Sequence, residues 1–436
     1  MGESKHIKGA FTSVKTLDHH LLRSTHPMLN SPAGATPESV ATPPYPVIHW
    51  LEAGAECSAR WRSERGSLPP KKVVLADDTM TADAAYRLAC EGTYMLWRGD
   101  FHNARQLLQA LARRIENTPA RKRKKAAQVV PANEVFNRYR LTQSQRARLL
   151  NMLLVNFDSD YKVNLRRAPD VKAACAAVWG APDDTTTASV ASLRELLGIT
   201  SSAEWRRVGV EIPELGHAPN NRIFPHYGVF SPVRGEYIKL VATAHVPKHI
   251  AGQEDLVAFD IGTGTGVLAA VLARRGVGKI VATDQEPRAL ICARENLAQL
   301  GLEDQVELLQ ADLFPPGKAA IVVCNPPWLP ARPSTPIEHA VYDEGSRMLM
   351  GFLKGLPHHL TAKGEGWLIL SNLAENLGLR TREELLAAFE TNGLRVVSRI
   401  DAKPLHTKAD DNTDPLHDAR AKEVTSLWRL AAIKPV

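Results

Sequence analysis

Cysteine is scarce in this chain: five occur among 436 residues, and no two form a Cys-x-x-Cys pair. A disulfide framework or a structural zinc site needs a regular cysteine pattern, so the scattered thiols indicate reduced cysteines in a cytosolic protein. The histidines and aspartates between positions 406 and 417 fit no metal-ligand spacing. We interpret that segment as a solvated polar loop and expect no bound metal.

Long apolar runs are missing as well. The longest candidate, Val267 to Ala273, is followed by two arginines and is far shorter than the roughly 20 residues of a membrane-spanning helix. No apolar segment follows the first residues, and position 6 is histidine, so neither a secretory signal nor myristoylation is expected. A cytoplasmic protein without a membrane partner is the resulting expectation.

Two common catalytic signatures are absent, the Gly-x-Ser-x-Gly elbow and the phosphate-binding Gly-Lys-Ser/Thr loop. What is present is the composition of an ordinary soluble protein, with 44% hydrophobic and 23% charged residues. A chain of 436 residues is too long for one small core, so two or more domains are expected.

Positive charge is concentrated in one stretch. The net charge is +7, yet residues 101–150 alone hold twelve Lys or Arg against two Glu. Such an excess favours a polyanionic partner, most simply RNA or the ribosome. The alternative is a solvated linker with basic helix faces. Arg138, Arg140, Arg146 and Arg148 stand beside Phe136 and Tyr139, a set that suits phosphate contact and base stacking but equally a helix with its aromatics packed inward.

Three segments differ in pattern. Residues 1–75 are expected to be irregular or disordered, with a short strand at 71–76. Residues 76–215 predict a mainly helical, substrate-recognition domain, and residues 216–436 an α/β domain. Helices are expected in five places: from the Thr81 cap through Leu96, from the Asp100 cap through Ile115, at 133–156 including Leu153 and Leu154, at 171–179 and at 189–197.

From Val257 onward, strand and helix patterns alternate. Strands are expected at 256–260, 279–283, 306–310, 320–324, 365–370, 394–400 and 425–433, and helices at 266–275, 286–300, 344–355 and 381–392. This alternation predicts a doubly wound, parallel, Rossmann-like sheet of seven strands. The last two strands are joined by a polar loop without a helical pattern, so the final strand should be antiparallel.

A glycine turn follows the first of these strands. Gly262, Gly264 and Gly266 allow a sharp bend and the close approach of a ligand, and the amides of the following helix favour an anionic group. Asp284 ends the next strand, where an acidic side chain would accept hydrogen bonds from ribose hydroxyls. Asp312 ends the third strand and could accept an adenine amino group.

A dinucleotide-binding oxidoreductase is the competing interpretation of this turn. It would prefer Gly-x-Gly-x-x-Gly, whereas the third glycine here comes one residue early. It also gives no role to the second turn of the domain, Asn325-Pro326-Pro327-Trp328, which follows a fourth strand.

The Asn-Pro-Pro-Trp turn predicts the chemistry. Its prolines stiffen the corner and hold Asn325 with its side-chain carbonyl toward the site. That carbonyl and a backbone carbonyl near Pro326 can accept both hydrogens of a planar –NH2 group, while Trp328 offers a flat face for stacking. The lone pair of such a nitrogen is delocalised, which makes it a poor nucleophile. Holding it in line with a methyl donor and removing water from it would lower the barrier to methyl transfer.

With these motifs, residues 256–328 resemble the class I S-adenosylmethionine (SAM)-dependent methyltransferases, more narrowly the small methyltransferase domain group. That group includes HemK-like glutamine methyltransferases and ribosomal RNA guanine methyltransferases. The resemblance implies a seven-stranded fold with an antiparallel last strand. It places the three glycines along the methionine part of SAM, Asp284 at the ribose, Asp312 at the adenine, and Asn325 with Pro326 at the acceptor nitrogen.

The chain departs from the family at two places. Trp328 stands where the glutamine enzymes usually have Tyr and the guanine enzymes Phe, and Asp343–Arg347 replaces a glycine-rich turn. The turn at 232–236 is only faintly similar to the Arg-Pro-Glu turn of HemK-like proteins.

The hypothesis is therefore a SAM-dependent N-methyltransferase acting on a planar amide or exocyclic amine of a macromolecule, either an RNA base or a protein glutamine. The alternative from another class is a catalytically inactive, SAM-binding RNA-binding or assembly protein. The catalytic residues expected are Asn325, Pro326, Pro327 and Trp328. The cofactor-binding residues expected are Asp260, Gly262, Thr263, Gly264, Gly266, Asp284, Gln285, Asp312, Leu313 and Asn325.

Overall fold

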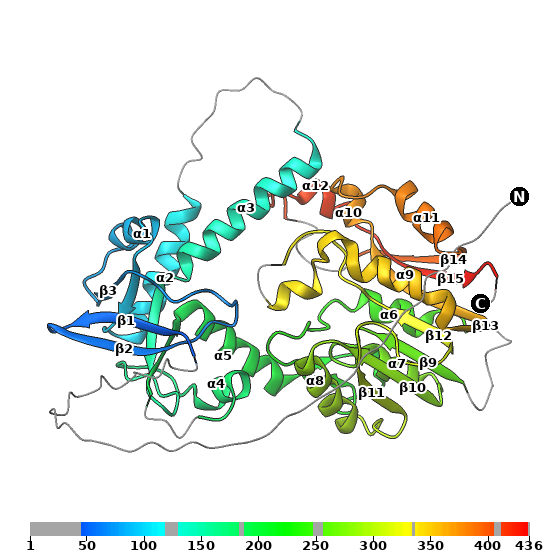
Figure 1. The fold of residues 1–436 in the computed structure, drawn as a ribbon, viewed down its shortest axis with the longest axis horizontal. Coiled ribbons are helices and arrows are strands. Elements are labelled where there is room, and N and C mark those ends of the chain that lie inside the picture. Colours follow the sequence, from blue (N-terminus) through cyan, green and yellow to red (C-terminus); the bar gives the residue numbers. More distant parts are fainter. Residues whose placement is uncertain are drawn as a thin grey trace, which may run out of the picture. The chain divides into compact units, whose positions relative to one another are not determined.

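The computed structural model describes residues 45–117, 130–182, 187–246, 256–333, 336–404 and 411–434. Two large sheets with their helices, and one two-stranded sheet, lie in the described region from Pro44 onward, shown in Figure 1. The basic run Arg121–Lys125 and the expected irregular tail at 1–44 lie outside the described residues.

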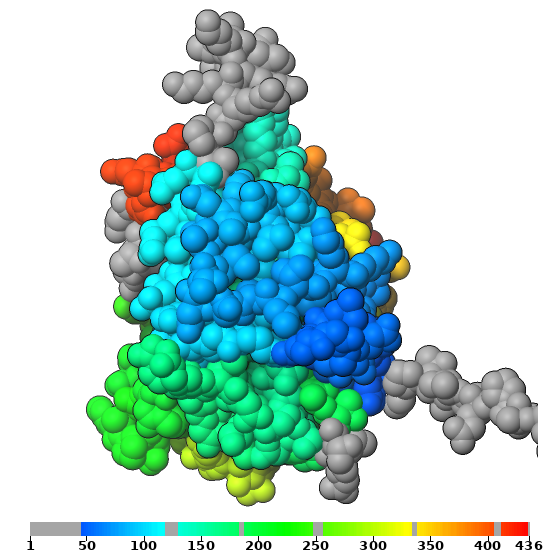
Figure 2. Space-filling view, turned by 90° about the vertical axis from the view of Figure 1, so that its left-hand side faces the viewer, coloured from blue at the N-terminus to red at the C-terminus, as the bar shows by residue number. Residues whose placement is uncertain are grey.

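The first part contains a six-stranded mixed sheet in the order β1-β2-β6-β5-β4-β3, with five helices. Its strands are β1 (Val47–Glu52), β2 (Ala55–Trp61), β3 (Val73–Ala76), β4 (Tyr94–Trp97), β5 (Leu153–Phe157) and β6 (Ser189–Ser192). Its helices are α1 (Ala82–Cys90), α2 (Phe101–Glu116), α3 (Ala132–Leu150), α4 (Lys172–Trp179) and α5 (Leu193–Val208). In Figure 2 the face toward the viewer is formed largely by this part, coloured blue to green.

Local signals correctly located several helix starts. The Thr81 hydroxyl accepts a hydrogen bond from the Ala84 amide at 3.2 Å, and the Asp100 carboxylate accepts one from the His102 amide at 2.8 Å. Both side chains satisfy amides that have no partner inside the helix, which is why these residue types begin helices. The helix expected at 171–179 is α4.

The sheet of this part is a correction to the sequence interpretation. Strands β1 and β2 form a hairpin in a segment expected to be irregular, and Leu96 lies in β4, not on a helix face. Leu153 and Leu154 belong to β5, and 189–192 form β6 before α5 begins. Short apolar runs do not distinguish a buried strand from a buried helix, because a strand covered on both faces shows no alternation.

The second part has the predicted seven-stranded sheet, in the order β11-β10-β9-β12-β13-β15-β14. Its strands are β9 (Val257–Ile261), β10 (Lys279–Asp284), β11 (Val306–Gln310), β12 (Ala319–Cys324), β13 (Leu360–Ser371), β14 (Leu394–Ala402) and β15 (Thr425–Ala432). β15 runs antiparallel to both of its neighbours, so the prediction of an antiparallel last strand is confirmed.

Helices cover both faces of this sheet. They are α6 (Glu236–Thr243), α7 (Val267–Arg274), α8 (Pro287–Gln299), α9 (Arg347–His359), α10 (Leu373–Asn376), α11 (Arg382–Thr391) and α12 (His417–Arg420). The remaining short elements are β7 (Val210–Glu211), β8 (Arg222–Ile223), η1 (Pro213–Leu215), η2 (Pro336–Ala340) and η3 (Glu344–Ser346).

Alternation along each strand divides the apolar residues between two layers. In β12, Ile321 and Val323 join the cluster of α6, α7 and α8, whereas Val322 and Cys324 join that of α9 and α11. Because successive side chains of a strand point to opposite faces, a continuous apolar run is buried on both. The chain order places β10 on one side of β9 and β12 on the other. In doubly wound sheets, ligands bind at the carboxyl ends of the strands where the order reverses in this way.

Candidate active site

The glycine turn joins β9 to α7 in left-handed backbone conformations. Gly262, Gly264 and Gly266 have φ angles of +73°, +56° and +81°. A side chain at Gly262 would lie 2.5 Å from the Met348 methyl group, and one at Gly266 would lie 3.3 Å from Ala293 Cβ. Only glycine meets these conformations without strain, so the geometry explains the residue type at each position.

Asp260 fixes the turn from beneath. Its carboxylate is 1% exposed and accepts hydrogen bonds from the Thr263 hydroxyl at 2.7 Å and from the Ala269 amide at 3.1 Å. Burial raises the pKa of Asp260 to about 6. Asp260 and Thr263, both expected to bind the cofactor, therefore bond to each other and hold the loop.

Asp284, at the end of β10, supports the same turn from the neighbouring strand. Its two oxygens accept from the Gly264 amide and the Glu286 amide, each at 3.0 Å. Burial also raises the pKa of this carboxyl group. Each carboxylate oxygen can accept more than one hydrogen bond, so this side chain keeps capacity for hydroxyl donors.

These residues fit a nucleoside-bearing ligand. A Cβ added at Gly264 would meet nothing within 4 Å, so open space lies against the backbone of the turn at this residue. The Asp284 carboxylate bonds to the Gly264 amide at this point, and the amides at the start of α7 follow the turn. SAM bound here would supply a methyl group on a positively charged sulfur.

Asp312 and Gln285 are brought together by a residue that the sequence analysis did not single out for the cofactor. Arg347, the first residue of α9, donates to the Asp312 carboxylate at 3.1 and 3.3 Å and to the Gln285 side-chain oxygen at 3.2 Å. Leu313, which follows Asp312 in the chain, has a φ of +79°. Its carbonyl accepts a hydrogen bond from the Thr283 hydroxyl at 2.5 Å. The end of β11 is thus tied to the end of β10 and to the start of α9.

The segment before α9 holds that helix against the turn. Asp343 is buried, and its carboxylate accepts from the amides of Met348 and Leu349, each at 3.1 Å. Met348 in turn contacts the glycine turn at Gly262. The segment 343–347, which differs from the glycine-rich turn that the resemblance implies, lies beside the expected cofactor site.

The Asn-Pro-Pro-Trp corner lies at the carboxyl end of β12, the neighbour of β9. Val323 pairs in register with Asp260, so Asn325 follows directly beside the glycine turn. Pro326 is buried, and Trp328 is half-buried between the two core layers. The Trp328 indole N–H donates to the Asn325 side-chain oxygen at 3.0 Å. The sequence did not predict this contact between Trp328 and Asn325.

The basic and aromatic surface expected on α3 has another role. Phe136 is 2% exposed and packs with Leu329, Leu373 and Leu416 of the second part. Tyr139 is partly buried in the same cluster. The interpretation with inward-packed aromatics is the correct one for this helix, because an amphipathic stripe is buried wherever a partner surface is available.

The arginines of α3 are also engaged. Arg140 donates to the Glu338 carboxylate at 3.2 Å and to the Arg332 carbonyl. Arg138 pairs with Glu134, and Arg146 pairs with Glu116 at 2.6 Å. Among the described residues of this helix, Arg148 is an exposed cation for which no ion pair is seen.

The polar loop near the C-terminus shows no metal site in its described portion. Nowhere in the described ranges do three His, Cys, Asp or Glu side chains gather as metal ligands. His406 and Asp410 lie outside those ranges, and Asp414 pairs with Arg420 at 2.8 Å. No helix within the described ranges is both long enough and apolar enough to span a bilayer.

Comparison with known proteins agrees with this geometry. The family model described as "Methyltransferase small domain" matches residues 220–390. A protein of Methanocaldococcus jannaschii, provisionally named a protein N5-glutamine methyltransferase, is 28% identical over 156 residues, covering 34% of this chain and 75% of that protein.

Shorter matches are closer in sequence. The ribosomal protein L11 methyltransferase of Vibrio cholerae is 34% identical over 93 residues, which are 21% of this chain and 32% of that protein. The release factor glutamine methyltransferase of Cereibacter sphaeroides is 41% identical over 76 residues, which are 17% of this chain and 27% of that protein. The match thus spans about a third or less of these two relatives. Solved methyltransferase structures match with TM-scores of 0.28 to 0.35.

The matched segment contains the glycine turn, the strand-end carboxylates and the Asn-Pro-Pro-Trp corner, which lie at the ends of β9 to β12 of the seven-stranded sheet. Residues 220–390 are therefore similar to the small methyltransferase domain family of class I methyltransferases, whose methyl donor is SAM.

Proposed function

We propose that this protein transfers the methyl group of SAM to the side-chain amide nitrogen of a glutamine in a protein of the translation apparatus. The observation that carries the proposal is the position of Asn325, whose side-chain oxygen lies at the carboxyl end of β12 beside the glycine turn of β9. Similarity to proteins named as glutamine methyltransferases supports the same acceptor.

The corner residues would act by orientation. The Asn325 oxygen accepts one N–H of the amide, and a carbonyl of the rigid Pro326-Pro327 segment accepts the other, so the nitrogen lone pair faces the sulfonium methyl. Trp328 packs against both core layers beside Asn325, and a bound substrate would complete the exclusion of water from this contact. The alkylated nitrogen then loses a proton, so no strong general base is needed before transfer.

An exocyclic amine of an RNA base is the second candidate. The observation in its favour is the run of five basic residues at 121–125, in a stretch otherwise poor in acidic residues. Because the described aromatics of α3 pack inward, this candidate depends on the basic run and not on that helix.

The test uses methyl-labelled SAM and a cell extract, followed by separate ribonuclease and protease treatment. Release of label by protease, with a 14-Da addition on glutamine in a peptide mass spectrum, is the result expected; release by ribonuclease would contradict the first candidate. Asn325→Ala should bind SAM within about twofold of wild type yet lose at least about 100-fold in turnover. Labelling that persists at the wild-type rate in Asn325→Ala would contradict the mechanism.

A further inference from the structure

The acceptor corner is held by a set of polar contacts that begins at Trp328. An indole nitrogen can only donate a hydrogen bond, so the atom of Asn325 that faces it at 3.0 Å is the side-chain oxygen and not the amide nitrogen. This contact sets the orientation of the amide group. The oxygen retains a second acceptor position for an incoming N–H.

Arg234 contacts the ring of the same tryptophan. Its guanidinium carbon lies 6.0 Å from the centroid of the Trp328 ring, at the outer range of a cation–π contact. The guanidinium also lies 3.5 Å from the Glu423 carboxylate, and its side chain is 29% exposed. Because Glu423 holds the Arg234 guanidinium in place, movement of the Trp328 ring would separate the cation from the face of the ring. The contact therefore restricts the position of the ring.

The carboxylate of Glu423 is buried and held by neighbouring residues. Its side chain is 0% exposed, and it accepts a hydrogen bond from the Ser371 hydroxyl at 2.9 Å. Ser371 is the last residue of β13, so the carboxylate is attached to a strand end beside β12. Burying a carboxylate is costly unless donors compensate it, which argues for a role at this position.

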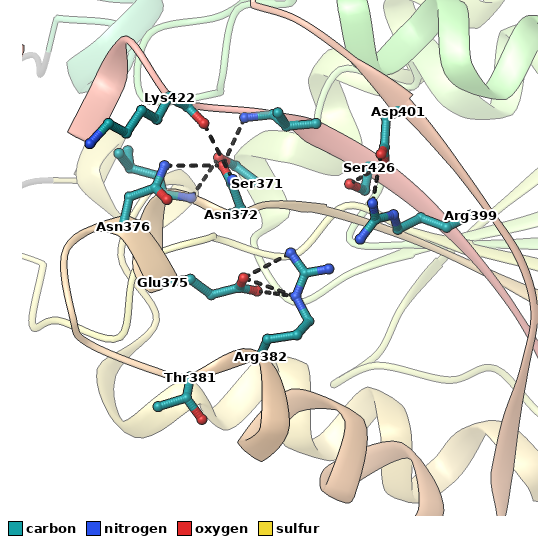
Figure 3. Close-up of polar contacts among 12 residues, drawn as sticks. Ser371, Asn372, Glu375, Asn376, Thr381, Arg382, Arg399, Asp401, Lys422 and Ser426 are labelled. Atoms are coloured by element: carbon teal, nitrogen blue, oxygen red, sulfur yellow. Dashed lines mark hydrogen bonds and ion pairs between the residues drawn. The ribbon is translucent and has the colours of Figure 1, made fainter. Parts of the chain in front are cut away.

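The backbone around Glu423 is fixed on both sides by one side chain. Asn372 donates to the Lys422 carbonyl at 3.3 Å and accepts from the Val424 amide at 2.7 Å, while Asn376 donates to its oxygen at 3.3 Å. Figure 3 shows this group converging on Asn372 next to Ser371. Because residues 422 and 424 are both held, the glutamate between them has little freedom.

We propose that Glu423 and Arg234 are positioning residues of the acceptor corner: they fix the Trp328 ring, and its N–H fixes the Asn325 oxygen toward a substrate that donates an N–H. The inference rests on the proposed function and deepens it, because it gives Trp328 a role in placing the acceptor. It also defines the acceptor as a hydrogen-bond donor, such as a primary amide or amine.

Kinetics on the full chain provide the first test, with the substrate fraction identified by labelling. Glu423→Gln and Arg234→Met should each lower kcat about tenfold while the Kd for SAM stays within about twofold. Arg234→Lys keeps the cation and should recover most of the loss. Glu375→Gln is the matched control, because the Glu375 carboxylate lies in the same region and pairs with Arg382 (Figure 3).

Equal kcat values for wild type, Glu423→Gln and Arg234→Met would overturn the proposal. A loss of the same size in Glu375→Gln would do so too, because it would indicate a general structural effect. Arg234 is partly exposed, so its variant remains informative should the buried Glu423→Gln fail to fold.

A second measurement does not depend on turnover. In protein labelled with 15N-tryptophan, the Trp328 indole signal is assigned by its disappearance in Trp328→Phe. Glu423→Gln and Arg234→Met should shift this signal and speed its exchange with water, whereas Glu375→Gln should not. An unchanged signal in both variants contradicts the inference. Absence of methylation by the wild-type protein contradicts the proposed function instead, and the indole signal then decides the inference alone.

Discussion

The guanidinium of Arg140 lies 3.8 Å from the centroid of the Tyr342 ring, so helix α3 of the first part contacts the segment that follows the acceptor corner in the second. That segment leads from the corner to Asp343, which holds the start of α9 beside the glycine turn. The contact therefore connects the N-terminal part to both sides of the proposed site.

Replacing Arg140 by Met should destabilise this contact and lower turnover several-fold, with little change in SAM affinity. A double-mutant cycle with Tyr342→Leu, measured by urea denaturation, should give a coupling of about 0.5–2 kcal/mol. Arg138→Ala is the control, since Arg138 lies on the same helix but pairs only locally with Glu134. Strict additivity of the two substitutions would contradict the interaction.

Glu195 should make stability fall as pH rises. It is 8% exposed, accepts from the Glu64 amide at 3.1 Å, and burial raises its pKa from 4.5 to about 7. The folded state then holds a proton that the unfolded state has released, so the stabilisation is complete below pH 4.5 and is lost up to about pH 7, with a size of roughly 3 kcal/mol.

Urea denaturation of wild type and Glu195→Gln at pH 5 and pH 8 measures this effect. Glutamine cannot titrate, so the variant should lose much less stability between the two pH values. Other buried acids titrate in both proteins, and the difference between the two proteins isolates Glu195. Identical losses in wild type and variant would show that Glu195 ionises normally.

Asp260 should make SAM binding depend on pH. Its pKa is raised to about 6 by burial, and the pKa of Asp284 beside it is also raised. A cationic sulfonium favours the ionised carboxylates, so SAM affinity should rise several-fold as pH increases through about 6. S-adenosylhomocysteine carries no sulfonium charge and should show a smaller change; equal pH profiles for the two ligands in calorimetric titrations would refute the prediction.

Arg347 should assist SAM binding through Asp312. Both side chains are well exposed, so their ion pair is weak and sensitive to salt. It nonetheless orients the carboxylate expected to meet the adenine amino group. Arg347→Met should raise the Kd for SAM about two- to fivefold at low salt, and high salt should weaken binding to wild type more than to the variant. A tighter Kd in the variant would show that the ion pair obstructs the site.

Local residue patterns were sufficient to predict the second sheet. Every strand and main helix from Val257 onward lies within a few residues of its expected place, apart from a longer β13. The signals that locate such elements involve only a few neighbouring residues. They are glycines that require positive φ, helix caps such as Thr81 and Asp100, and apolar runs covered on both faces. Such local signals also explain why strands of the first part were predicted as helices. Short buried strands and short buried helices have equally apolar sequences, so the local pattern does not distinguish them.

The sequence by itself determined the order of the strands and helices of the catalytic domain, the glycine turn and the proline-stiffened corner. Tertiary structure alone decided which distant side chains meet there: Arg347 with Asp312, Arg234 with Glu423, and α3 with the segment after the corner. The physical reason is that long, charged side chains take partners from whatever elements packing brings near, and no short pattern in the chain encodes that choice.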